Sequence, residues 1–106
     1  MMVASGLAGF LQPYSNLVSI QVKQVLSPCE WVVSMGDGVD FPVRMQDENL
    51  NRRIADGTAH IRVGDILKAR VETTPCMRGS RLSTRGRRIL EIRSRYDIGT
   101  RQWTAI

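Results

Sequence analysis

The sequence has few of the residues that most often carry out chemistry. Its 106 residues include two cysteines and one histidine, and 6% of its side chains are aromatic. Two cysteines are too few for a disulfide-rich scaffold, and with a single histidine they cannot complete a zinc set within one chain. No paired-carboxylate site, nucleophile–base pair or cofactor fingerprint is present. The sequence therefore favours a protein that is not an enzyme, with no catalytic residue, no metal site and no cofactor.

Long hydrophobic runs are also lacking. No apolar stretch approaches the ~20 residues that a membrane-spanning helix needs, so we expect no membrane partner. Residues 1–11 are apolar, but they lack the basic start and the cleavage site of a signal peptide. Cys29 and Cys76 each follow a proline and are interpreted as ordinary thiols in loops at the same end of the domain. We expect a cytoplasmic protein whose thiols are reduced.

The residues that are present are typical of one small folded domain. The hydrophobic share of 42% and the charged share of 24% are close to globular averages, and the length leaves little room for a second domain. We assign residues 1–16 to an apolar N-terminal extension, residues 17–96 to the domain and residues 97–106 to a tail. The extension is expected to be buried somewhere, for example as a short helix docked on the domain or on a neighbouring subunit.

Alternating apolar and polar residues predict strands in the first half of the domain. Val18, Ile20 and Val22 recur at every second position, which is the period of a strand with one buried face. Residues 29–45 alternate in the same way on both sides of a glycine-flanked turn at residues 36–38, and they predict a hairpin. Its core-facing positions are expected to be Trp31, Val33, Met35, Phe41, Val43 and Met45.

A helical pattern follows the hairpin. Asp47 is a suitable N-cap, and Leu50 and Ile54 lie four residues apart on one helical face. Gly57 can end the helix. These residues predict one short helix over residues 47–55.

Three further strands are predicted, at residues 60–63, 67–71 and 89–92. In the last of these strands, Leu90 and Ile92 are expected to face the core. Residues 74–87 are polar and rich in glycine and arginine, and they are predicted to form a long loop that is either functional or mobile.

The positive charge of the chain is concentrated near its C-terminus. The net charge is +5, yet the segment from Arg78 to Arg101 alone contains eight arginines and two acidic residues, a local net charge of +6. The remaining residues carry seven basic and eight acidic groups, a net charge of −1. Such a segment attracts phosphate backbones or an acidic protein, or it is a solvated face that keeps the protein soluble. Arginine favours bidentate contacts with phosphate or carboxylate.

The order of the predicted elements resembles that of the oligonucleotide/oligosaccharide-binding (OB) barrel. The segment Val63-Gly64-Asp65-Ile66 is similar to the sequence that leads into the fourth strand of RNA-binding barrels of the ribosomal-protein and cold-shock type. The resemblance covers residues 17–96. It implies a mainly β fold, a small barrel of five to six strands with one short helix between strands 3 and 4. It also implies ligand contacts by the loop between the last two strands and by the loop after the first strand.

The sequence departs from that family in its aromatic residues. Nucleic-acid-binding barrels stack bases on aromatic side chains of the sheet surface, whereas Trp31 and Phe41 lie on the faces predicted to be core. Binding is therefore expected to depend on arginines of the predicted loop and on basic residues of the neighbouring strands. The candidate nucleic-acid-binding residues are Lys68, Arg70, Arg78, Arg81, Arg85, Arg87, Arg88 and Arg93.

Three hypotheses about function remain open. The first is a non-catalytic module that binds nucleic acid, single-stranded nucleic acid in particular, through the arginine-rich segment. The second is a protein-interaction module, a homodimer in which residues 1–12 and the Trp103 tail form the contact. The third is a small protein whose biochemical role the sequence does not indicate.

Overall fold

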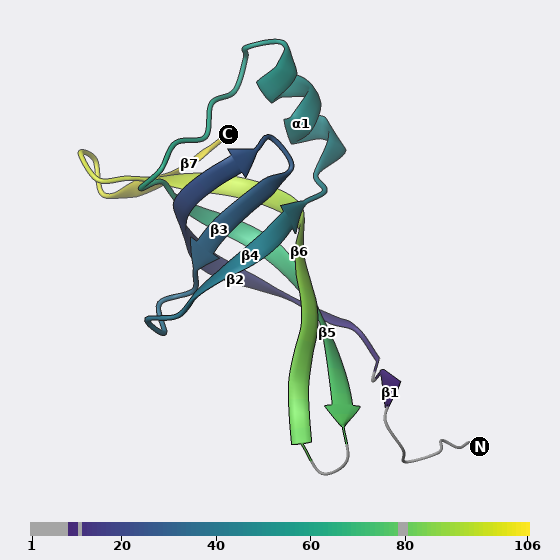
Figure 1. Ribbon diagram of the computed structural model, residues 1–106. Coiled ribbons are helices and arrows are strands. Elements are labelled where there is room, and N and C mark those ends of the chain that lie inside the picture. Colours follow the sequence, from purple (N-terminus) through teal and green to yellow (C-terminus); the bar gives the residue numbers. More distant parts are fainter. Residues whose placement is uncertain (1–8, 11, 79–80) are drawn as a thin grey trace.

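The computed structural model describes residues 9–10, 12–78 and 81–106, and of residues 9–10, 76–78 and 81–85 it describes the backbone alone. It is a β structure with one short helix (Figure 1). In chain order the elements are β1 (Gly9–Phe10), β2 (Tyr14–Ser27), β3 (Glu30–Ser34), β4 (Asp40–Met45), α1 (Glu48–Ala55), β5 (Ile66–Arg78), β6 (Arg81–Asp97) and β7 (Gln102–Ala105).

Five strands form a closed ring of hydrogen-bonded neighbours. β2 pairs with β3 and β5, β3 pairs with β4, and β5 pairs with β6, all antiparallel. β4 pairs in parallel with β6, with Arg44 opposite Arg88 and Met45 opposite Ile89, and this pairing closes the ring. The predicted mainly β, barrel-like fold is confirmed, and α1 lies between the third and fourth strands of the ring.

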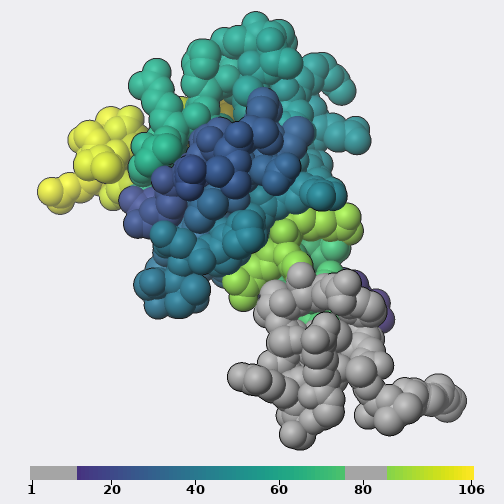
Figure 2. All heavy atoms as spheres, in the orientation of Figure 1, coloured from purple at the N-terminus to yellow at the C-terminus, as the bar shows by residue number. Residues whose placement is uncertain are grey.

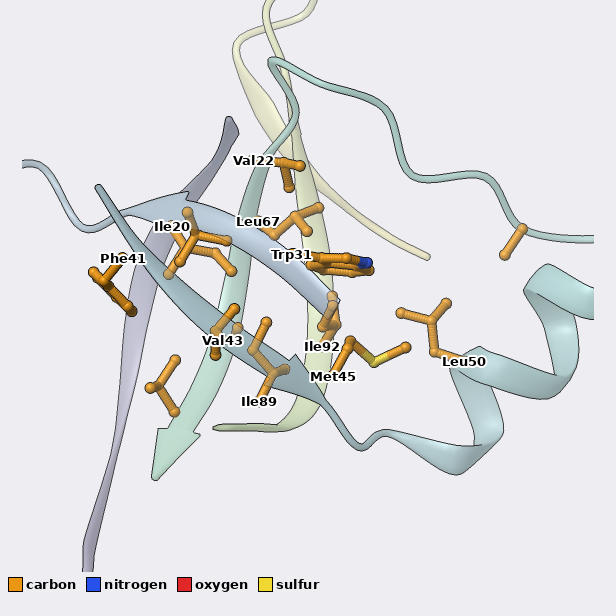
Figure 3. Close-up of a cluster of buried hydrophobic side chains, with 14 residues drawn as sticks. Ile20, Val22, Trp31, Phe41, Val43, Met45, Leu50, Leu67, Ile89 and Ile92 are labelled. Carbon is orange, nitrogen blue, oxygen red and sulfur yellow. The ribbon is translucent and has the colours of Figure 1, made fainter. Parts of the chain in front are cut away.

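The hydrophobic core lies inside this ring. Its buried side chains come from all five strands and from α1, and Trp31, which is 1% exposed, is the largest that is fully buried (Figure 3). Burial of each large apolar side chain contributes roughly 1.5–3 kcal/mol. The inward positions predicted for the first three strands are confirmed, although Val18 and Met35 are only partly buried.

The predicted core face of the last strand is partly wrong. Ile89 and Ile92 are buried, whereas Leu90 is only half-buried. The pairing of β6 with β5 shifts register between Ile89 and Glu91, so that Leu90 has no partner. This β-bulge adds one residue to β6 and breaks the period of two on which the prediction depended.

The helix begins and ends as the sequence predicted. Asp47 Oδ1 accepts the backbone N–H of Leu50 at 3.0 Å, and Oδ2 of the same carboxylate accepts the N–H of Ile92 at 3.0 Å. One side chain therefore caps α1 and fastens it to β6. Gly57 follows the helix with a φ of +83°. In the described part of the chain, no helix is long and apolar enough to cross a membrane.

Residues 60–63 do not form the predicted strand. The chain turns at Gly64, whose φ of +98° suits glycine, and β5 begins two residues later. Asp65 Oδ2 accepts the backbone N–H of Arg62 at 2.9 Å, and the N–H of Gly64 donates to the carbonyl of Val22 at 2.8 Å. Here the Asp65 carboxylate accepts the backbone N–H of Arg62 in place of a carbonyl on a neighbouring strand. The apolar residues of segment 60–63 therefore do not form a strand.

Within residues 74–87, those that the structure describes (74–78 and 81–87) do not form the predicted loop; residues 79–80 lie outside the described part. They form the outer halves of β5 and β6, paired from Thr74–Gly86 to Arg78–Arg81. Two antiparallel strands satisfy each other's backbone groups, so this hairpin forms although its sequence is polar. The hairpin extends beyond the barrel (Figure 1). The radius of gyration is accordingly 15.9 Å, against about 13 Å for a compact domain of this length.

The two end segments each contribute a strand to the sheet. Residues 9–10 form β1, which pairs with β5, and not the short helix that was expected. Residues 1–8 and 11 lie outside the described part, and they include most of the segment expected to form a homodimer. Residues 102–105 form β7, which pairs with β6.

The two cysteines differ in their surroundings. Cys29 is exposed in the turn between β2 and β3, as expected for a loop. Cys76 lies in β5 and is paired in register with Ser83. Its predicted place in a loop is therefore wrong, for the same reason that residues 74–87 are not a loop.

Candidate nucleic-acid interface

All eight candidate binding residues lie on the two long strands, β5 and β6. Arg78, Arg81 and Arg85 belong to the outer part of the hairpin, where Arg78 lies opposite Arg81 in the register. Their side chains are outside the described part of the structure. The backbone nevertheless places these three arginines on one two-stranded ribbon that projects from the barrel (Figure 1).

Three other candidates have acidic neighbours on the outer face of the barrel. The Nε atom of Arg88 lies 2.7 Å from Oε1 of Glu72. Arg70 and Arg93 share Glu91, with N–O distances of 3.9 and 3.2 Å. Exposed pairs of this kind contribute only about 0–1 kcal/mol to stability. Glu72 compensates the charge of Arg88, and Glu91 compensates one of the two charges of Arg70 and Arg93. These residues therefore attract phosphate less strongly than the sequence suggested.

Lys68 lies on a different part of the surface. Its ammonium group is 4.6 Å from the centroid of the Trp103 ring, and Trp103 packs edge-to-face against Tyr96 at 5.2 Å. Trp103 thus packs on the barrel, through Tyr96 and Lys68. These contacts hold β7 against β6 and do not bring Lys68 to the hairpin.

Arg87 and Arg44 make no ion pair. The Arg87 guanidinium lies over the Phe41 ring, 4.3 Å from its centroid, and the exposed Arg44 lies opposite Arg88 on β4. Glu30 is the cross-strand neighbour of Arg44. Within the described residues, which include all ten acidic side chains, no carboxylate oxygen is within 4.0 Å of either guanidinium. Two uncompensated positive charges therefore meet at the base of the hairpin.

Two hollows open at this base, with volumes of about 390 and 190 Å³. Arg44, Gly86 and Arg87 line both of them, and we call the two together the hairpin groove. Pro13 contributes to the larger hollow and Pro42 to the smaller one. In the space-filling view, the described base of β6, in light green, lies against the blue layer of β3 and β4 (Figure 2).

A third hollow, of about 340 Å³, lies at the opposite end of the barrel, beside α1. Of the three arginines that line it, Arg53 and Arg95 are bonded to the chain itself, whereas the side chain of the exposed Arg62 makes no ion pair with a described residue. Arg53 Nη1 donates to the carbonyl of Ile106 at 2.6 Å. Arg95 donates to the carbonyl of His60 and lies 3.4 Å from a carboxylate oxygen of Asp65. Arg53 and Arg95 hold the chain together and are poor candidates for ligand contacts.

Arg44 and Gly86 are not among the site residues predicted from the sequence. The alternation along β4 does place Arg44 on the outer face, between the inward Val43 and Met45. Nothing in the sequence shows, however, that β4 pairs in parallel with β6, and this pairing brings Arg44 to the arginine-rich segment.

Comparison of the chain with protein-family models, with curated proteins and with solved structures finds no match in any of the three. Within the residues that the structure describes, no group of three or more His, Cys, Asp and Glu side chains could hold a metal ion.

Proposed function

We propose that this protein is a non-catalytic module that binds nucleic acid through the hairpin groove and the arginines of the β5–β6 hairpin. The observation that carries the proposal is the pair Arg44 and Arg87, two guanidinium groups that line the same groove and have no carboxylate within 4.0 Å among the described residues. Arg88, Glu72 and Glu30 also line the groove, so its three arginines outnumber its two glutamates. Positive groups in a groove raise the local concentration of phosphate chains and bind them by releasing counterions.

The order of the strands supports the same proposal. In the ring, β2 is followed by β3, β4, β6 and β5, and the helix comes after the third strand. This order is consistent with the resemblance to the OB barrel, a fold that hosts many nucleic-acid-binding modules. Because a fold does not fix a function, the arginines carry the argument and the strand order only supports it.

The direct test is a titration of fluorescent oligonucleotides with the protein. Single-stranded DNA, single-stranded RNA and duplex DNA are compared at about 50 and about 200 mM salt. Three phosphate contacts on a single strand should lower the affinity roughly 20-fold between these salt concentrations. Failure to bind any of the three at the lower salt concentration would contradict the proposed function.

Charge-reversal variants locate the binding surface. Arg85→Glu combined with Arg87→Glu should weaken binding several-fold or more and leave the fold intact. The matched control is Lys23→Glu combined with Arg52→Glu, which changes the net charge equally at exposed positions of β2 and α1. Equal losses in both double variants would mean that net charge, and not the hairpin, determines the affinity.

A further inference from the structure

Neither packing nor backbone conformation requires the glycine at position 86. A Cβ atom built on Gly86 meets no atom within 4 Å, and its φ lies outside the left-handed region. Gly86 lies in the middle of β6, paired with Thr74, where glycine is less favourable than a β-branched residue. A glycine inside a strand marks a β-bulge, a tight bend or a place where a ligand approaches the backbone closely. The register with β5 shifts between Gly86 and Thr84, so a bulge lies directly beside Gly86. The open space at its Cβ position is the feature that is available to a ligand.

Gly86 also lines both hollows of the groove. Its neighbour Arg87 and Arg44 from β4 line both of them as well. The space at the Cβ position of Gly86 is open, and a side chain at this position would extend into that space.

We propose that a single strand of nucleic acid crosses β6 at Gly86, and that the open space at this glycine selects single strands over duplexes. This inference rests on the proposed function and specifies its ligand. Arg44 on β4 and Arg87, the next residue after Gly86, line both hollows and contact the phosphates. Arg87 is held over the Phe41 ring at 4.3 Å, and a guanidinium held in this way also provides a surface for base stacking.

The form of the groove favours a single strand. The groove is concave, and its walls carry apolar surface from Pro13, Pro42 and the 53%-exposed Leu26. The bases of a single strand are free to turn toward such walls, whereas those of a duplex are stacked inside it. A duplex would instead accept a protruding element, such as a two-stranded ribbon, in its major groove. Binding at the concave base therefore indicates a single strand.

Substitutions of increasing size at position 86 test this inference. Gly86→Ala should leave the affinity for single-stranded DNA and RNA within about twofold, because a methyl group fills little of the open space at this position. Gly86→Leu should weaken binding about tenfold, which corresponds to the loss of one stacked base. Thermal unfolding followed by circular dichroism verifies that each variant is folded. If Gly86→Leu does not fold, Gly86→Thr provides the bulky side chain on a residue that favours strands.

The outcomes separate this inference from the proposed function. If the wild-type protein binds no nucleic acid, both fail. If it binds single strands and loses affinity on reversal of Arg85 and Arg87 but not in Gly86→Leu, the function stands and the crossing at Gly86 is wrong. Tighter binding of duplex DNA than of single strands would also overturn the inference, and would point to the projecting ribbon in the major groove.

Discussion

The helix end and the hairpin end of the barrel both carry arginines, but the partners of these arginines differ. At the helix end, Arg53 and Arg95 donate to backbone carbonyls, and Arg95 also pairs with Asp65. At the hairpin end, Arg44 and Arg87 have no carboxylate within 4.0 Å among the described residues. Arg53 and Arg95 therefore support the structure at one end, whereas Arg44 and Arg87 are available for a ligand at the other. Arg62 is an exception at the helix end, because its side chain makes no ion pair with a described residue.

This difference shows what a count of charges leaves out. The sequence concentrates arginine between Arg78 and Arg101, and Arg95 and Arg87 are equal members of that segment. The two arginines differ only in the groups that their guanidiniums contact in the folded protein. Substitutions of the bonded arginines at the helix end should therefore mainly lower the free energy of unfolding. Substitutions of Arg44 and Arg87 at the hairpin end should mainly lower the affinity for nucleic acid.

The largest expected effect is on stability, at the helix end. Leu50 on α1 is 4% exposed and joins the core near Met45 and Ile92 (Figure 3). Leu50→Ala should lower the free energy of unfolding by about 2–5 kcal/mol, because it removes buried methyl groups and leaves a cavity. Urea unfolding measures this loss. Val39→Ala, at a position that is 59% exposed, serves as the control and should change stability by less than about 0.5 kcal/mol.

The second prediction concerns the carboxylate that joins α1 to β6. Asp47→Ala removes the acceptors of both the Leu50 and the Ile92 amide. The lost cap and the unpaired amide should together cost about 2–3 kcal/mol. Asp47→Asn retains one side-chain carbonyl, and its loss should be about half as large. Equal urea midpoints for the two variants would show that only one of the two hydrogen bonds matters.

Features that depend on local spacing could be predicted from the sequence. The period of two placed Ile20, Val22, Val33 and Val43 in the core. The Asp47 cap was also predictable, because an N-cap and its helix lie within one turn of each other. Its second hydrogen bond, to Ile92, joins residues 45 positions apart, and no local pattern indicates it.

Features that depend on a distant strand could not be predicted. The bulge at Leu90 arises from the register with β5, and residues 74–87 are strands because each half of the hairpin provides the partner of the other. The groove has the same origin. Arg44 and Gly86 line the same hollow only because β4 pairs in parallel with β6.

A third prediction compares one arginine from each end. Arg95→Met should lower the free energy of unfolding by about 1 kcal/mol, because the carbonyl of His60 loses its donor. Arg87→Met should change stability by less than about 0.5 kcal/mol, since the thioether also packs well on the Phe41 ring. Affinity for single-stranded DNA should show the reverse order. If Arg95→Met weakened binding more than Arg87→Met, the division between the two ends would be wrong.

The smallest expected effect is electrostatic and lies in the turn after α1. The hydroxyl of Thr58 donates to Asp56 at 2.6 Å and its backbone N–H donates at 2.9 Å. These hydrogen bonds, with a smaller contribution from Arg53, lower the pKa of the Asp56 carboxyl. Thr58→Val removes the hydroxyl bond, and the pKa of Asp56 should therefore rise toward its ordinary value, as an NMR titration of that carboxyl can show.

The sign of the pH dependence follows from the lowered pKa. A carboxyl with a lower pKa in the folded state stabilises the protein above its pKa in the unfolded state, and this contribution is lost as the pH falls through the folded value. Wild type and Thr58→Val should therefore differ most above about pH 4, the usual range of an aspartate, and converge in stronger acid. Asp56 is exposed, so the difference should be small. If the two stability curves instead diverged on acidification, Asp56 would not be the group that Thr58 stabilises.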